Sequence, residues 1–357
     1  MLTIGVDAHK RVHVAVSLDV FGGELAHWRG QNSPAGWRDL LDWVSAQDEH
    51  RRFGVEGAWS YGRGLAQYLV AAGETVYEIN PRWTAAGRLH SRKPGKTDRL
   101  DAAAVATLVL QEGDSLPHVY QDDESSVLNL LTVERDTALA DATRLRNQLH
   151  VQLMQLDPEY QLHLPPIRSR RGLAAAKEYT VADPNPLRQV RVAVVRRLAA
   201  RLELTLDQAD EMAVKIRELA ERHFKPLTRL CGVNLLTAGA LAGILGPGPR
   251  FRSDASLAAY AGVSPLEASS AARVRHRLNR GGNRRLNALL FRIAITQARH
   301  LPAAQAYLAR RTSEEKTRRE AYRALKRYLA RAVFKLWSEC LEDRYGPTPP
   351  PATSPCT

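Results

Sequence analysis

The stretch LTIGVDAHKRVHVAVSLDVFGGEL, residues 2–25, decides how the chain begins to fold. Ile4 and Val6 alternate with small or polar residues, and the valines at positions 12, 14 and 16 alternate again. Alternation with a period of two is the pattern of a half-buried strand, and the pair Gly22-Gly23 supplies a turn. The stretch therefore predicts three consecutive strands.

Strands and helices then alternate up to about residue 123. The pattern predicts helices over 34–47, 61–72 and 98–111, and short apolar runs predict strands over 53–58 and 76–80. Strands that alternate with helices are typical of an α/β layer, in which helices cover a sheet. We therefore predict a mixed α/β domain over residues 1–123.

A helical period replaces this alternation in the rest of the chain. Leucine and valine recur every three or four residues over 124–156 and again over about 187–224. Such spacing is typical of amphipathic helices, and we expect the pair to form a coiled-coil linker over 124–224. Residues 225–345 are predicted to form a basic, all-α domain, and the proline-rich tail 346–357 is predicted to be disordered.

The composition points to a polyanionic partner. The chain carries 51 lysines and arginines against 38 acidic residues, which gives a net charge of +13. The excess is mostly arginine and no basic amphipathic helix stands at a terminus, so nucleic acid is favoured over an anionic membrane surface. No apolar run is long enough to span a bilayer, and the first residues do not resemble a signal peptide. Three separated cysteines without a CxxC pair argue against a zinc ribbon or a disulfide framework and fit a reducing cytosol.

Four acidic residues stand where a strand ends or a helix begins. Asp7 follows the first strand, Glu56 ends the run FGVE, and Asp98 and Asp101 open the helix after KPGK. Residues three apart share one face of a helix, so both aspartates can point at one spot. Each acid alone has a structural explanation, as a helix start or a solvated strand end. Together they predict an all-oxygen Mg²⁺ site.

A basic stretch follows in SPLEASSAARVRHRLNRGGNRRLN, residues 264–287. Six arginines and one histidine stand between positions 273 and 285, with no acidic residue among them, which predicts a phosphate-binding stripe. Ser269 and Ser270 precede it, and a serine among guanidinium groups can attack phosphorus, although a turn or cap serine is the alternative. The nucleic-acid contacts we predict are Lys93, Lys96, Arg273, Arg275, Arg277, Arg280, Arg284 and Arg285.

These motifs, in this order and over nearly the whole chain, resemble the DEDD transposases of the insertion sequence 110 family, which are recombinases of mobile elements. The N-terminal RuvC-like domain of that family, which has an RNase H fold, is similar to GVDAHK (5–10), EGAWSYG (56–62) and KTDRLDA (96–102). Its C-terminal transposase domain is similar to GVNLLTAGALAGILG (232–246), SLAAYAGVSP (256–265) and RGGNRRLNALL (280–290). The turn at 232–238 is also similar to a helix-hairpin-helix, which holds a DNA backbone without reading its sequence.

The resemblance implies an activity, a cofactor and partners. The four metal-binding acids of the family fall on Asp7, Glu56, Asp98 and Asp101, which would hold one or two Mg²⁺ ions, with Mn²⁺ as a substitute. The serine that forms a phosphoserine link to DNA falls on Ser270, with Ser269 as the alternative; Ala271 and Ala272 follow where relatives carry glycine. Implied partners are the double-stranded DNA of the element ends and target, a structured guide RNA, and three further copies in a homotetramer built as a dimer of dimers. The implied location is the bacterial cytosol, at the nucleoid, with no membrane contact.

Two other functions remain open from the residues alone. A Holliday-junction-resolvase-like nuclease would use the four acids with water as the nucleophile. A non-catalytic nucleic-acid scaffold would use only the basic residues. A sugar kinase or ATPase of the actin fold is disfavoured, because Asp7 is followed by Ala8-His9 rather than by a glycine that cradles phosphate.

Overall fold

The computed structural model describes residues 1–81, 83–84, 97–183, 185–264, 266–267, 276–277, 282–314 and 316–345. These residues form two compact units. Unit 1 contains 1–123, 246–257 and the segment from 341 onward, and unit 2 contains 124–245 and 258–340. Each unit has its own core, and we describe each by itself.

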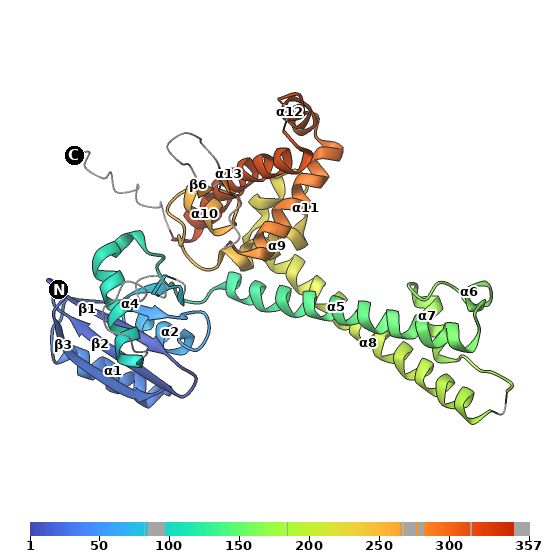
Figure 1. Cartoon of the computed structure of the whole chain (residues 1–357), viewed down its shortest axis with the longest axis horizontal. Helices are drawn as coiled ribbons and strands as arrows, with labels where there is room; N and C mark the ends of the chain where they lie inside the picture. Colours follow the sequence, from blue (N-terminus) through green and yellow to red (C-terminus); the bar gives the residue numbers. More distant parts are fainter. Residues whose placement is uncertain are drawn as a thin grey trace. The chain divides into compact units, whose positions relative to one another are not determined.

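Unit 1 is built on a five-stranded mixed sheet (Figure 1). The strand order is β3-β2-β1-β4-β5, with β1 antiparallel to β2 and parallel to β4. The strands are β1 (Leu2–Ala8), β2 (Val12–Leu18), β3 (Glu24–Gln31), β4 (Arg51–Glu56) and β5 (Thr75–Ile79). The three consecutive strands and the mixed α/β layer predicted from the sequence are confirmed.

Helices cover both faces of this sheet. On one face, α1 (Pro34–Ser45) and α2 (Arg63–Ala71) pack against Ile4 and Val6. On the other face, α4 (Asp98–Glu112) packs against Val14 and Val16. These two residues flank Ala15 on β2, whose side chain belongs to the first face. Side chains alternate between the faces of a strand, so Gly5, Asp7, Gly54 and Glu56 all belong to the face that α4 covers. The alternation of side chains between the two faces therefore decides which acidic residues can lie next to α4.

Two segments from late in the sequence belong to unit 1. In residues 246–257, the Arg250 guanidinium lies 2.6 Å from a Glu78 carboxylate oxygen on β5, and both side chains are largely buried. In the last turn of α13 (Arg318–Tyr345), the hydroxyl of Tyr345 donates to Asp123 at 2.9 Å. Unit 1 is therefore completed by residues far from it in sequence.

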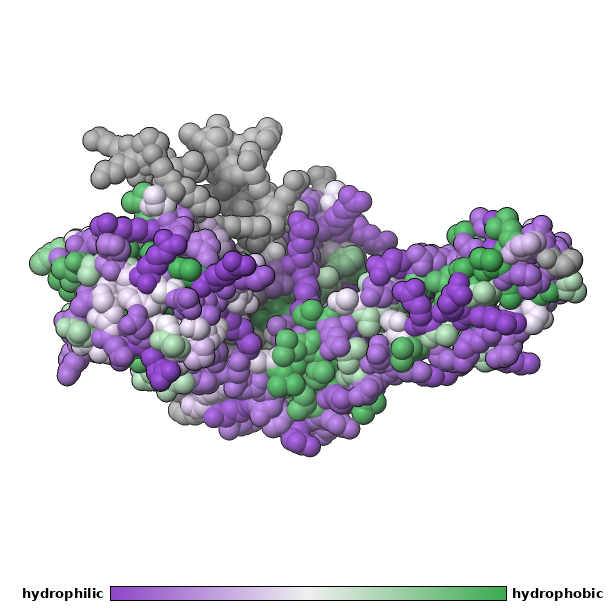
Figure 2. All heavy atoms as spheres, turned by 90° about the horizontal axis from the view of Figure 1, so that it is seen from below, coloured by the Kyte–Doolittle hydropathy of each residue, from purple (hydrophilic) through white to green (hydrophobic). Residues whose placement is uncertain are grey.

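Unit 2 is helical, as predicted for the chain after residue 123. Its long helices α5 (Glu124–Leu156) and α8 (Pro186–His223) pair through buried leucines and valines, and the short helices α6 (Tyr160–His163) and α7 (Arg170–Lys177) cap the end of this pair. Apolar spheres gather at that end in Figure 2, where Leu162 is exposed. The remaining elements are η2 (Lys225–Arg229), α9 (Leu235–Leu245), α11 (Arg284–His300), α12 (Pro302–Ser313), the last residues of α10 (Asp254–Tyr260) and α13 up to residue 340.

The basic segment of unit 2 contains a feature that the all-α prediction lacked. Leu266–Glu267 (β6) pairs antiparallel with His276–Arg277 (β7). Each strand is only two residues long, too short for a period of two to be read from the sequence. The helical prediction for this domain is confirmed apart from this pair.

Candidate metal centre

A glycine brings α4 directly onto β1. A Cβ atom added to Gly5 would lie 2.2 Å from both the backbone oxygen of Ala102 and the backbone nitrogen of Ala106. Only a residue without a side chain permits this approach. The close contact fixes the N-terminal turn of α4 near the carboxyl end of β1, where Asp7 stands.

Three side chains meet at that end. His9 Nε2 lies 3.0 Å from Asp7 Oδ2 and 3.6 Å from Asp98 Oδ1. One potential ligand atom from each residue lies within 4.8 Å of the others, which is close enough for the three to share one metal ion. Asp7 is buried, whereas His9 and Asp98 are exposed, so the group is open to a substrate on one side.

Asp101 contributes to the same spot from the first turn of α4. Thr97 caps this helix by accepting a hydrogen bond from the Leu100 amide at 3.3 Å. Asp101 is only 4% exposed. Burial raises the pKa of Asp7 above its ordinary value of 3.8; His9 opposes this shift, and the charges of Asp101 and Asp98 add to it. The three carboxylates predicted from this part of the sequence are therefore electrostatic neighbours.

Glu56 stands at the end of the neighbouring strand. In the parallel register Val6 is opposite Val55, so Asp7 and Glu56 are the next residues along their strands. Glu56 accepts a hydrogen bond from the Thr84 hydroxyl at 3.2 Å and is partly buried. Its position next after Val55 in the parallel register, and the alternation of side chains along β4, place Glu56 on the same face of the sheet as Asp7.

This donor set fits a divalent cation. Crowded carboxylates repel one another, and a bound cation removes that repulsion and the cost of burying Asp7. Carboxylate oxygens suit Mg²⁺ and Mn²⁺. His9 was not predicted as a site residue. His9 stands two residues after Asp7, and residues two apart lie on the same side of an extended chain. This spacing could have indicated His9 as a neighbour of Asp7.

The segment that carries the predicted serine nucleophile is closed at its base in unit 2. The Asn283 amide donates to the Tyr260 carbonyl at 2.7 Å, and the Asn287 side chain donates to the Ala261 carbonyl at 2.8 Å. A Cβ added to Gly282 would lie 2.3 Å from the backbone of Gly262. The two ends of the segment therefore touch, while Ser269 and Ser270 lie outside the described residues.

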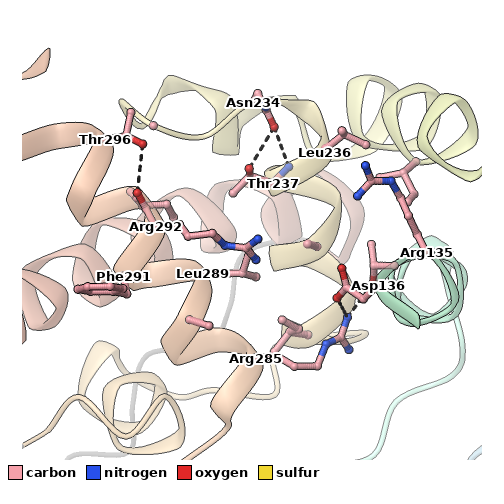
Figure 3. A pocket seen from close by; sticks show the side chains of 17 residues that line it. Arg135, Asp136, Asn234, Leu236, Thr237, Arg285, Leu289, Phe291, Arg292 and Thr296 are labelled. Atoms are coloured by element: carbon pink, nitrogen blue, oxygen red, sulfur yellow. Dashed lines mark hydrogen bonds and ion pairs between the residues drawn. The ribbon is translucent and has the colours of Figure 1, made fainter. Parts of the chain in front are cut away.

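The predicted nucleic-acid contacts are described only in part. Arg284 is exposed at the start of α11. Arg285 instead lies against α5, where it donates to Asn129 Oδ1 at 3.2 Å and lies 3.4 Å from Asp136 (Figure 3). The side chain of Arg277 and the residues Lys93, Lys96, Arg273, Arg275 and Arg280 lie outside the described part of the chain.

Within the described residues, every helix is too short or too polar to cross a membrane. Comparison with known proteins then identifies the family. Residues 4–158 match a DEDD-type family described as transposase, and residues 225–309 match the transposase family of IS116, IS110 and IS902.

Full-length relatives agree with these matches. The chain is 27% identical to the 43.6 kDa protein of insertion element IS110 from Streptomyces coelicolor, with 93% of each chain covered. It is 24% identical to the 44.8 kDa protein of IS116 from Streptomyces clavuligerus, over 98% of this chain and 97% of the relative. It is 26% identical to the 42 kDa protein of IS900 from Mycobacterium paratuberculosis, with 94% of each chain covered. The chain belongs to the IS110 family of transposases.

Proposed function

We propose that this transposase cleaves and rejoins DNA strands at the ends of its insertion element with a metal centre in unit 1 and a serine nucleophile in unit 2. The observation that carries the proposal is the meeting of Asp7, His9 and Asp98 at the junction of β1 and α4, where the charge of Asp101 also acts on Asp7. The charges of Asp101 and Asp98 add to the effect of burial in raising the pKa of Asp7, and a buried carboxylate beside two others is costly for folding, which favours a functional role over a helix cap.

The acids would hold the cation. Asp7, Asp98, Asp101 and Glu56 supply carboxylate oxygens for one or two Mg²⁺ ions, and Mn²⁺ can replace Mg²⁺. The cation, when bound, supplies positive charge that neutralises the scissile phosphate. His9 fixes the orientation of Asp7 through the 3.0 Å contact of its Nε2. With one oxygen of Asp7 held by this contact, the remaining lone pairs of the carboxylate can face the cation.

The serine would make the covalent link. Ser270 Oγ, with Ser269 as the alternative, attacks the phosphorus of a phosphodiester; a P–Oγ bond forms and the P–O bond to one deoxyribose breaks. The hydroxyl proton of the serine is lost, and the departing deoxyribose oxygen gains a proton, so charge and atoms balance. Guanidinium groups from 273–285 would stabilise the charge on the pentavalent phosphorus.

Element ends and target DNA are the proposed substrates, and the net charge of +13 supports binding to these polyanions. We further propose a structured RNA from the element's non-coding end as a guide, and a homotetramer as the active form. Retention of that RNA by the purified protein tests the guide. The mass of the complex, measured by light scattering, tests the homotetramer.

Strand cleavage tests the metal centre directly. The substrate is a labelled duplex that contains an element junction, incubated with Mg²⁺, Mn²⁺ or EDTA. We expect Asp98→Asn/Asp101→Asn to lose metal-dependent cleavage, and to lose Mn²⁺ binding followed by electron paramagnetic resonance. The matched control is Asp207→Asn/Asp210→Asn, which removes two exposed carboxylates with the same spacing that pair with Arg170 on the surface.

The outcomes separate the alternatives. Recombination by the Asp98/Asp101 variant would show that these acids only cap a helix. Ser270→Ala and Ser269→Ala should abolish the protein–DNA adduct singly or in combination. Cleavage without an adduct in the parent protein would instead establish a resolvase-like nuclease with water as the nucleophile. Binding of DNA without any cleavage would establish a scaffold.

A further inference from the structure

A second basic site lies in unit 2, apart from the residues assigned above. A cavity of about 960 Å³ opens between α11 and the first turns of α13. Its lining includes Phe291 and Tyr322 together with the cations Arg299, Arg318, Arg319, Arg323 and Lys326. No acidic side chain from the part of the chain that the structure describes lines it. We call these residues the aromatic–arginine groove.

Four of the five cations of this groove contact no carboxylate among the described residues. Arg323 lies 3.9 Å from Glu320, at the outer limit of an ion pair. Among the residues that the structure describes, the guanidinium groups of Arg299 and Arg319 contact no carboxylate. A mixed surface would pair these charges, so their excess favours an anionic ligand.

Lys326 gives a stronger indication, because it is buried. Only 8% of this residue is exposed. Its ammonium group donates to Asn287 Oδ1 at 2.7 Å and lies 5.8 Å from the centre of the Phe291 ring. Burial lowers the pKa of Lys326, and the nearby charge of Arg323 lowers it further. A neutral amide and a ring face compensate a buried ammonium poorly, and an anion in the groove would supply the missing charge.

The aromatic rings indicate which anion fits. Phe291 is 44% exposed, and its ring meets that of Tyr322 edge-on with a centroid distance of 5.8 Å. The Arg318 guanidinium lies 5.9 Å from the Tyr322 ring. Partly exposed aromatic rings next to arginines are the elements that bind single-stranded nucleic acid, in which bases stack on rings and cations hold phosphates. A duplex hides its base faces and cannot use Phe291.

Phe291 also lines an adjoining cavity of about 690 Å³ (Figure 3). Arg135 from α5 and Arg292 from α11 line this second cavity. The Nε of Arg135 is buried and has no hydrogen-bond partner among the described residues. Phe291 therefore lines two cavities that both carry arginines, and in the second one Asp136 pairs with Arg285.

We propose that the aromatic–arginine groove and the adjoining cavity bind a segment of unpaired DNA, with a base stacked on Phe291 and Tyr322 and phosphates held by the arginines and Lys326. This inference deepens the proposed function and rests on it for the source of the strand, since cleavage and strand exchange expose unpaired nucleotides. Nothing in the stacking depends on base identity, so the groove would bind strands of any sequence.

Fluorescence anisotropy tests the proposal without the metal centre. The probe is a labelled oligothymidylate of about 12 nucleotides, in EDTA, with a duplex and an RNA of the same length as competitors. We expect Phe291→Leu and Tyr322→Ala each to raise the Kd about tenfold, since stacking of one base is lost. The matched control is Tyr328→Ala, on the same helix, which removes a 54% exposed ring that packs on Tyr307 outside the groove. It should change the Kd less than twofold.

The salt dependence supplies a second measure. Arg299→Ala/Arg319→Ala should reduce the slope of log K against log salt by about 1.4, the loss of two phosphate contacts to a single strand. Arg222→Ala, on α8, is the control for loss of an exposed charge that does not line the groove.

Three results would overturn the proposal. If the Tyr322→Ala and Tyr328→Ala variants bound the oligothymidylate with equal affinity, Tyr322 would not stack on a base. Duplex competing as well as the single strand would show backbone binding only. RNA competing more than tenfold better than DNA would assign the groove to RNA instead. Because EDTA removes divalent metal, a failed cleavage experiment leaves this binding result intact, and the reverse also holds.

Discussion

The contact between Gly5 and α4 makes a quantitative prediction about both stability and the metal centre. Gly5→Ala would place a methyl group 2.2 Å from two backbone atoms of α4. Ordinary contact begins near 3.4 Å, so α4 would have to move away from β1 by roughly 1 Å. Backbone cannot rotate out of the way as a side chain can.

The expected cost lies at the upper end of the range for overpacked cores. Inserted methylenes cost about 1–3 kcal/mol, and we expect about 3 kcal/mol for Gly5→Ala because a whole helix must shift. The same shift moves Asp98 and Asp101 relative to Asp7. A misplacement of about 1 Å at a reacting centre can reduce the rate on the order of a hundredfold. The variant should therefore lose cleavage activity under conditions in which it remains folded.

Urea unfolding followed by tryptophan fluorescence measures the stability. The method reports mainly on unit 1, because it contains five of the six tryptophans, at positions 28, 37, 43, 59 and 83. The matched control is Gly54→Ala. Gly54 pairs with Gly5 across the strands, but its added Cβ would meet only side chains, with Val109 Cγ2 nearest at 2.4 Å.

The control also provides a rescue experiment. We expect Gly54→Ala to cost about 1 kcal/mol and to show favourable coupling with Val109→Ala, which removes the obstructing methyl groups. Gly5→Ala should show no rescue by Ala106→Gly, since the obstructing atoms are backbone. A loss of less than about 1 kcal/mol for Gly5→Ala, or rescue by Ala106→Gly, would refute the argument.

Two further predictions concern buried charges in unit 1. Burial lowers the pKa of His13 below its ordinary value of 6.5, so the unfolded chain binds a proton at a pH at which the folded chain does not. The free energy of unfolding should therefore fall as the pH drops below about 6.5. The variant His13→Leu should reduce this pH dependence, measured by urea titrations at pH 5 and 7.5. Arg250→Met should cost about 3–5 kcal/mol because it leaves Glu78 buried without its cation, and Arg250→Met/Glu78→Gln should cost much less by calorimetry. Equal losses in the single and double variants would contradict this account.

The sequence predicted the sheet and the acids because both follow from local spacing. Alternation around Ile4 and Val14 defines strands, and the parity of Asp7 and Glu56 follows from it. The same alternation would also have placed His9 on the side of the chain that carries Asp7. The pairing of β6 with β7 could not, since two residues per strand leave no period to detect.

Contacts between distant segments account for most of what was missed. Phe291 and Tyr322 are 31 positions apart in sequence and belong to different helices, and no spacing rule indicates that their rings meet. Arg285, a predicted nucleic-acid contact, donates to side chains of α5 more than a hundred residues earlier, a contact that no local spacing indicates. Which arginines remain available for a ligand depends on packing, and packing is not local.

The late segments of unit 1 have a consequence for the order of events during synthesis. Arg250 is made 172 residues after its partner Glu78, and Arg344 is made 221 residues after its partner Asp123. At about 5–20 residues per second, the first pair is delayed by roughly 10–30 s on the ribosome. Unit 1, whose sheet carries Asp7 and Glu56, therefore gains its last ion pairs only when the chain is nearly complete, so a truncated translation product would carry an unfinished unit 1.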